Sequence, residues 1–133
     1  MEKSTLAEIE QEIELFYNSI SDQFPDYRDV EEICEYAEGL MGAMARVGKL
    51  HSDSRYWLNE ATKDSIVENL TKNVGLSPSV LKELVKVTCK RQHYCCDMTE
   101  KIYKTICRQF EFCRSIISKE KVEKSLAFGG VNN

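Results

Sequence analysis

The sequence predicts an all-α fold, an elongated bundle of about four helices with a long C-terminal helix. Apolar residues recur at spacings of three and four along most of the chain, and the alternating apolar and polar runs of strands are hard to find. Only two prolines and six glycines interrupt the 133 residues. We expect one helical-bundle domain over residues 1–124, followed by a flexible C-terminal tail over residues 125–133.

The first helix is predicted to begin at Thr5, which can form a capping box with Glu8. Pro25 is expected to end this helix, and Asp26 to cap the next one. The predicted buried face consists of Leu6, Ile9, Ile13, Phe16, Ile20 and Phe24.

The second predicted helix extends to Val47 and has one apolar side. Small residues crowd its segment 37–45, where each helical glycine costs up to about 1 kcal/mol relative to alanine. We expect close packing against a neighbouring helix to offset this cost, with a ligand-exposed backbone or a hinge as alternatives. The apolar side consists of Val30, Ile33, Cys34, Ala37, Leu40, Met41, Met44 and Val47.

A break is predicted over residues 48–54, because Gly48 is followed by the capping residues Ser52, Asp53 and Ser54. The third helix then ends near Asn73, with Gly75 at its C-terminal cap. Nothing between residues 49 and 55 forbids helix outright, so the alternative is one rod that joins the second and third helices. The apolar residues of the third helix are Trp57, Leu58, Ala61, Ile66, Val67 and Leu70.

The fourth helix is predicted to begin at Ser77 and Pro78 and to reach about Lys121. Unbroken, it would span roughly 65 Å at about 1.5 Å per residue, which outruns a compact domain of this size. Its apolar stripe needs cover along its whole length, and a second copy of the chain is the simplest cover. A bend within residues 91–94 is the alternative, because the two halves could then fold against each other.

Charge is divided unequally along the chain, whose net charge is −4. Residues 1–38 carry twelve acidic and two basic side chains, whereas the remaining residues carry ten acidic and sixteen basic ones. The two ends can attract each other, or the basic part can bind an acidic ligand. No segment is apolar enough to cross a bilayer, and the N-terminus lacks a signal peptide, so we expect a cytoplasmic protein without a membrane partner. The six cysteines are interpreted as reduced thiols that fill the core.

Two groups of residues are candidate binding surfaces. Six residues at helical spacing could contact phosphates and stack bases, although a solvated face or the partner of the acidic helices is the simpler interpretation: Lys90, Arg91, Tyr94, Lys101, Lys104 and Arg108. Arg55, Tyr56 and Trp57 place the single tryptophan beside polar groups, which suits either a binding surface or the core.

Cys89, His93 and Cys96 offer the ligand types that zinc prefers, but residues seven apart lie about 10 Å apart along a straight helix. Packing thiols and an ordinary histidine are the better interpretation, so no metal ion is predicted. The two histidines lie in no motif that would position a cysteine nucleophile, and no phosphate-binding glycine loop occurs. We therefore expect no catalytic residue, no enzymatic activity and no cofactor.

The chain contains MARVGKLHSDSRYWLNEA at residues 44–61 and CRSIISK at residues 113–119. With these segments, its C-terminal two-thirds resembles small helical proteins encoded by prophages and mobile elements of Bacteroides-type bacteria. The resemblance implies a phage or mobile-element origin and supplies no activity or site residue.

These observations favour a non-catalytic helical interaction or assembly protein that acts through protein contacts as a homo-oligomer. The alternative is a binder of nucleic acid or of a nucleotide signal through the basic C-terminal helix, in phage replication or in neutralising a host defence.

Overall fold

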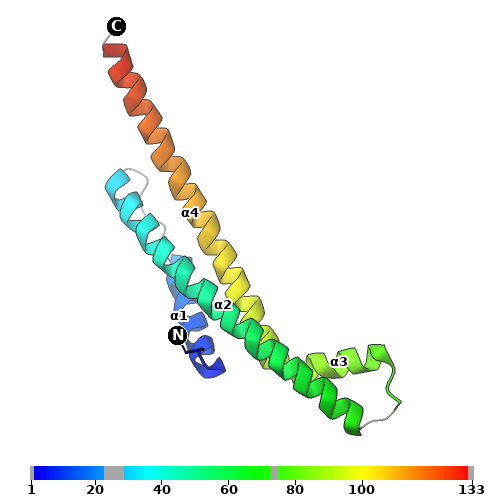
Figure 1. The fold of residues 1–133 in the computed structure, drawn as a ribbon. Coiled ribbons are helices and arrows are strands. Elements are labelled where there is room, and N and C mark those ends of the chain that lie inside the picture. Colours follow the sequence, from blue (N-terminus) through cyan, green and yellow to red (C-terminus); the bar gives the residue numbers. More distant parts are fainter. Residues whose placement is uncertain (1, 23–28, 73–74, 132–133) are drawn as a thin grey trace.

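In a computed structural model, two long antiparallel helices form the frame of the molecule (Figure 1). They are α2, Val30–Lys72, and α4, Lys90–Val131, and they share the largest interface. The two shorter helices are α1, Leu6–Asp22, and α3, Pro78–Thr88. The structure describes residues 2–22, 29–72 and 75–131, and within these ranges it contains four helices and no strand. The predicted all-α, elongated bundle with a long C-terminal helix is confirmed.

Helix α1 begins as the sequence predicts, since Thr5 Oγ1 accepts a hydrogen bond from the Glu8 backbone N–H at 3.2 Å. Its side chains Ile9 and Ile13 are buried, mainly against α4, while Leu6 and Phe16 pack at the edge of the core. The predicted roles of Phe24, Pro25 and Asp26, and the side chain of Ile20, lie outside the described residues.

Helix α2 is one continuous helix of 43 residues, so the predicted break at residues 48–54 is wrong and the single rod is correct. Asp29 precedes the helix, and its Oδ1 accepts a hydrogen bond from Glu31 N at 3.0 Å. The residues expected to cap a new helix bond elsewhere instead. Ser54 Oγ donates to the Leu50 carbonyl at 2.7 Å, and the Asp53 carboxylate accepts a hydrogen bond from Ser4 N at 3.0 Å.

The expected close packing of the small residues in α2 is not found at its exposed glycines. A Cβ added at Gly39 or Gly42 would meet no atom within 4 Å outside its own stretch of helix, so no neighbouring helix approaches there. Gly48 differs, because a Cβ at this position would lie 3.7 Å from the Tyr103 ring, in ordinary van der Waals contact. Close packing therefore does not account for Gly39 and Gly42.

The predicted single helix from Pro78 onward is also wrong, because it is interrupted at Cys89. The N-terminal cap is as predicted, with Ser77 Oγ accepting a hydrogen bond from Val80 N at 3.3 Å. Cys89 has φ −99° and ψ 22°, outside the helical range, and the chain changes direction there. Helix α3 then lies beside the end of α2 (Figure 1) rather than pairing with α4 as an antiparallel hairpin. Gly75, which follows the end of α2, has φ +97°. This left-handed backbone conformation is typical of a glycine that caps the C-terminus of a helix, as the sequence predicted.

The core lies between α1, α2 and α4 and is narrow. It consists of Ile9, Ile13, Ile33, Ala37, Leu40, Val47, Leu50, Cys95, Ile102, Ile106 and Cys113. All six cysteines are free thiols, and four of them are buried, in accord with their predicted packing role.

Helix α4 continues past the start of α2 (Figure 1), and every side chain from Lys121 to Leu126 is exposed. It remains helical to Val131, where the sequence predicted a tail; the flexibility of that segment stays a prediction. No helix in the described ranges has an apolar stretch long enough to cross a bilayer.

Two ion pairs fasten the acidic α1 to the rest of the bundle. Arg46 Nε of α2 donates to Glu12 at 2.8 Å, and Arg91 Nε of α4 donates to Glu10 at 2.8 Å. Both pairs are partly exposed, so each is expected to contribute little to stability. The charge asymmetry of the sequence is thus satisfied in part within one chain.

Candidate functional site

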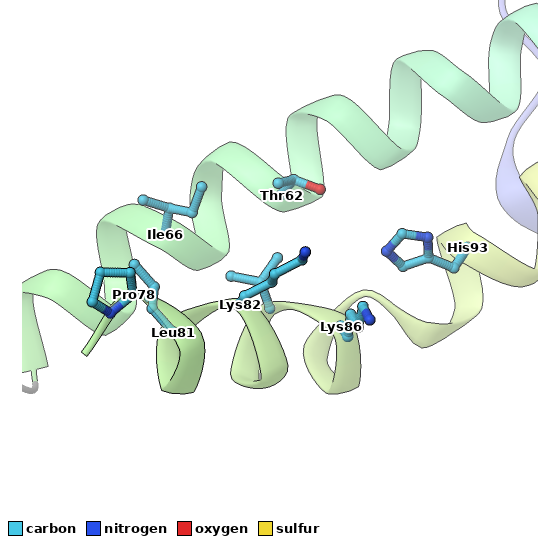
Figure 2. A pocket seen from close by; sticks show the side chains of 8 residues that line it. Thr62, Ile66, Pro78, Leu81, Lys82, Lys86 and His93 are labelled. Atoms are coloured by element: carbon cyan, nitrogen blue, oxygen red, sulfur yellow. The ribbon is translucent and has the colours of Figure 1, made fainter. Parts of the chain in front are cut away.

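The interruption at Cys89 creates a cleft where the end of α2, the helix α3 and the start of α4 meet (Figure 2). Its volume is about 390 Å³. Because α3 folds back beside α2, side chains from three helices reach this cleft even though they are up to 31 positions apart in sequence. We call it the α2–α3 cleft.

One end of the cleft is apolar. Ile66 projects from α2, and Pro78 and Leu81 face it from the first turn of α3 (Figure 2). Val85, one turn further along α3, is buried and continues this wall. The sequence produces the wall because Leu81 and Val85 are four residues apart and therefore share one face of α3.

Basic side chains border the other part of the cleft, although its lining is mainly apolar. Lys82 and Lys86 lie one turn apart on α3, Thr62 faces them from α2, and the ring of His93 points toward the same space from α4 (Figure 2). Among the residues that the structure describes, no aspartate or glutamate lines the cleft. The only carboxylate paired with either lysine in the described part of the chain is Glu83, 3.9 Å from Lys86 in an exposed and therefore weak pair.

A second hollow lies between α1 and α4 and is lined by charges of both signs. Glu10 and Glu14 line it from α1, and Tyr94 and Lys101 line it from α4. Since Glu10 already accepts hydrogen bonds from Arg91, this surface joins two helices of one chain. It gives no indication of a particular ligand.

The predicted binding residues Arg55, Tyr56 and Trp57 lie where the N-terminus meets α2. Trp57 packs against the core, and its indole N–H donates to the Ser4 carbonyl at 2.7 Å. Tyr56 contacts the Trp57 ring edge-on at 5.1 Å, and the Lys3 ammonium lies 4.1 Å from the centroid of the Tyr56 ring. Tyr56 and Trp57 therefore hold the N-terminal segment, while Arg55 is exposed.

Five of the six candidates on α4 share one exposed side. At about 100° per residue they fall within an arc of about 80°. This basic face consists of Lys90, Tyr94, Lys101, Lys104 and Arg108. Its charge is reduced by a pair between Lys104 and Glu100 at 3.1 Å. Arg91 lies off this face and bonds to Glu10 of α1.

The weak metal candidate does not form a site. No group of three or more His, Cys, Asp and Glu side chains suited to a metal ion occurs in the described part of the chain. Cys89 is completely buried, and the ring of His93 points into the α2–α3 cleft (Figure 2). Burial, followed by the charge of Asp97, raises the pKa of the Cys96 thiol, which opposes the thiolate form that a metal requires.

His51 makes a structural contact. Its Nδ1 lies 3.0 Å from Thr99 Oγ1, and this hydroxyl donates to the Cys95 carbonyl at 2.7 Å. The hydroxyl proton is therefore engaged, and the imidazole is the donor to Thr99 in this arrangement. His51 thus links α2 to the buried Thr99 of α4.

No protein-family model, curated protein or solved structure matches this chain.

The sequence indicated His93 only as a weak candidate metal ligand, and its predicted binding residues did not include Lys82 or Lys86. Thr62 was missed entirely. The cleft depends on the reversal of direction at Cys89, and no proline or glycine marks that position.

Proposed function

We propose that the protein is a non-catalytic helical interaction protein that self-associates through the solvent-facing side of α3. One observation carries this proposal. Val80, Leu84 and Val87 are 47%, 36% and 73% exposed, and they recur at spacings of four and three along α3. We call these three residues the α3 stripe.

This spacing is the one that two packed helices use along their common seam, with each apolar side chain fitting between side chains of the partner helix. Helix α3 has Leu81 and Val85 toward α2, so its apolar surface extends around more of the helix than α2 covers. A second copy of α3 offers a matching apolar stripe, and a two-fold arrangement would cover both at once.

Opposite charges beside the stripe support pairing with another copy. Glu83 lies beside the stripe and is exposed, and Lys86, three residues further along α3, is exposed as well. Antiparallel packing of two α3 helices can bring the acidic residue of one copy toward the basic residues of the other. A single-sign flank would repel its own copy instead.

The test is the mass of the protein in solution, measured by light scattering during size-exclusion chromatography over a concentration series. We expect the wild type to have twice the mass of one chain. Val87→Glu should be a monomer with an unchanged circular dichroism spectrum, because Val87 is exposed and contributes little to folding.

Leu15→Glu is the matched control, since Leu15 is a similarly exposed apolar residue on α1. This variant should retain the mass of the wild type. A wild type that remains monomeric up to about 100 μM, a concentration well above the Kd of a typical specific complex, contradicts self-association. Dissociation by Leu15→Glu but not by Val87→Glu would place the contact on another helix.

A second candidate function is binding of nucleic acid or of a nucleotide, favoured by the alignment of the basic face on one exposed side of α4. The same experiments can include a labelled single-stranded DNA. Binding that weakens steeply with salt and is reduced by Arg108→Gln would support this candidate, because phosphate contacts release counterions. The phage or mobile-element origin likewise stays a prediction.

A further inference from the structure

The α2–α3 cleft is a mainly apolar volume bordered by two lysines and a histidine. Binding sites for small molecules are typically concave, with mostly apolar walls and a few polar groups that fix orientation. The cleft fits this description, since Ile66 and Leu81 form its walls, while Lys82, Lys86 and His93 border it (Figure 2). Its volume of about 390 Å³ is within the range of such sites.

The charged side chains around the cleft indicate which charge a ligand would carry. Two lysines on the same flank of α3 repel each other, and within the described ranges no carboxylate lines the cleft to balance them. The pairing of Lys86 with Glu83 at 3.9 Å is exposed and weak, and Lys82 has no ion pair in the described residues. An anionic group between the two ammonium groups would relieve this repulsion, and the Thr62 hydroxyl and the His93 ring could add hydrogen bonds.

The shape of the cleft indicates what kind of apolar group a ligand would have. The lining residues of α3 run from Pro78 to Lys86, about 12 Å along the helix axis. This elongated wall suits an unbranched chain lying along α3 between Leu81 and Ile66 better than a compact ring system.

We propose that the α2–α3 cleft binds a small linear amphiphile with one anionic group, of the class of medium-chain carboxylates. The carboxylate lies between Lys82, Lys86 and His93, and the alkyl chain lies against Ile66, Leu81 and Pro78. The position of His93 depends on the change of direction at Cys89, because in one straight helix His93 would continue about 10 Å beyond Lys86 instead of facing the cleft.

This proposal is independent of self-association. At about 100° per residue, Lys82 and Lys86 lie on one flank of the face that α3 turns to α2, and the α3 stripe lies on the other. A ligand in the cleft therefore leaves the stripe uncovered, and Val87→Glu should still bind the ligand. A result that contradicts self-association therefore does not contradict ligand binding, and the converse is also true.

The experiment is a titration of the ¹⁵N-labelled full chain with octanoate, followed by two-dimensional NMR. We expect the largest shifts at the amides of residues 62–66 and 78–93. Octanol has the same chain without the charge, and acetate has the charge without the chain. We expect each to bind at least about tenfold more weakly than octanoate, since each lacks one of the two contacts.

Lys82→Gln and Lys86→Gln should each weaken octanoate binding by about fivefold, and the double variant by at least about twentyfold. Lys121→Gln, an exposed lysine on the distal part of α4, is the matched control and should bind like the wild type. Both cleft lysines are exposed, so the variants should keep the wild-type melting temperature.

Three results would overturn the proposal: equal binding of octanol and octanoate, unchanged affinity in the double variant, or shifts centred on the α3 stripe. The first two would remove the role of the charge, and the third would place the alkyl chain on a different surface.

Discussion

The Asp53 carboxylate shows how one side chain fastens the N-terminus to the bundle. It accepts a hydrogen bond from the Lys49 ammonium at 2.7 Å and another from Ser4 N at 3.0 Å. Burial by itself would raise the pKa of Asp53, but these donors outweigh burial, and the pKa lies below its ordinary value. A carboxyl with a lower pKa in the folded chain than in the unfolded chain stabilises the fold above the unfolded pKa. This contribution is lost as the pH falls through the folded pKa.

We predict that Asp53→Asn lowers the free energy of unfolding by about 2 kcal/mol at pH 7, because the variant loses a charged hydrogen-bond acceptor. The difference from the wild type should shrink as the pH falls below about 4, near the ordinary pKa of aspartate. Urea unfolding at a series of pH values measures both effects. Asp64→Asn, at an exposed position of the same helix, is the control and should change stability by less than about 0.5 kcal/mol. A difference that stays constant down to pH 2 would contradict the assigned role of the charge.

A second prediction concerns the thiols. Cys34 and Cys107 are partly exposed, whereas the other four cysteines are buried. Burial, with a smaller effect from Glu10, raises the pKa of the Cys95 thiol to about 11. The thiolate is the reactive form, so iodoacetamide at pH 8 should label Cys34 and Cys107 well before Cys95. Peptide mass spectrometry over time measures the order. In urea all six should react at similar rates, and rapid labelling of Cys95 in the folded chain would be inconsistent with its burial.

For single residues, the sequence predicts which side chains are buried better than it predicts which residues they form hydrogen bonds with. The six cysteines were predicted to be thiols that fill the core, and four of them are buried. Asp53 was predicted to cap a helix because only its neighbours in the sequence could be considered. Its backbone partner, Ser4, is 49 positions away, and only the packing of the N-terminal segment on α2 brings the two together.

At the scale of the elements, helix α2 is continuous although its local sequence favours a break. Gly48 and residues 52–54 have the composition of a turn, but Gly48 lies against Tyr103, and Leu50 beside it is buried in the core. Tertiary contacts of this kind override local preference, which is worth only about 1 kcal/mol per residue. At Cys89 the opposite is found: the helix is interrupted, although neither proline nor glycine at this position predicts a break.

The exposed glycines of α2 give the third prediction. Because a Cβ at Gly39 or Gly42 would meet open space, alanine at either position should raise the free energy of unfolding by about 0.5–1 kcal/mol. Thermal and urea unfolding of each single variant measure this gain. Ala45→Gly, on the same helix at an exposed position, is the reciprocal control and should lower stability by a similar amount. Destabilisation by both alanine variants would indicate that these glycines serve a close contact with another molecule.

On the scale of the whole molecule, the two ends of the bundle differ. One end has α3 folded beside α2, with the cleft on one flank of α3 and the stripe on the other. The opposite end is the single projecting part of α4, where Val122 and Leu126 are 58% and 70% exposed. The apolar spacings in the sequence could indicate that α4 exceeds its cover, but they could not show where α3 places its own apolar surface. That follows from the turn at Cys89.

The fourth prediction separates these ends. A chain that ends at Lys121 lacks the projecting residues, whose described side chains are all exposed, so its free energy of unfolding should change by less than about 0.5 kcal/mol. Its mean helicity should change little, because residues are removed from a molecule that is helical along most of its length. If the α3 stripe is the contact between copies, the truncated chain should have the same dimeric mass in light scattering as the full chain. A truncated chain that is monomeric, while Val87→Glu remains dimeric, would assign self-association to the end of α4 and not to α3.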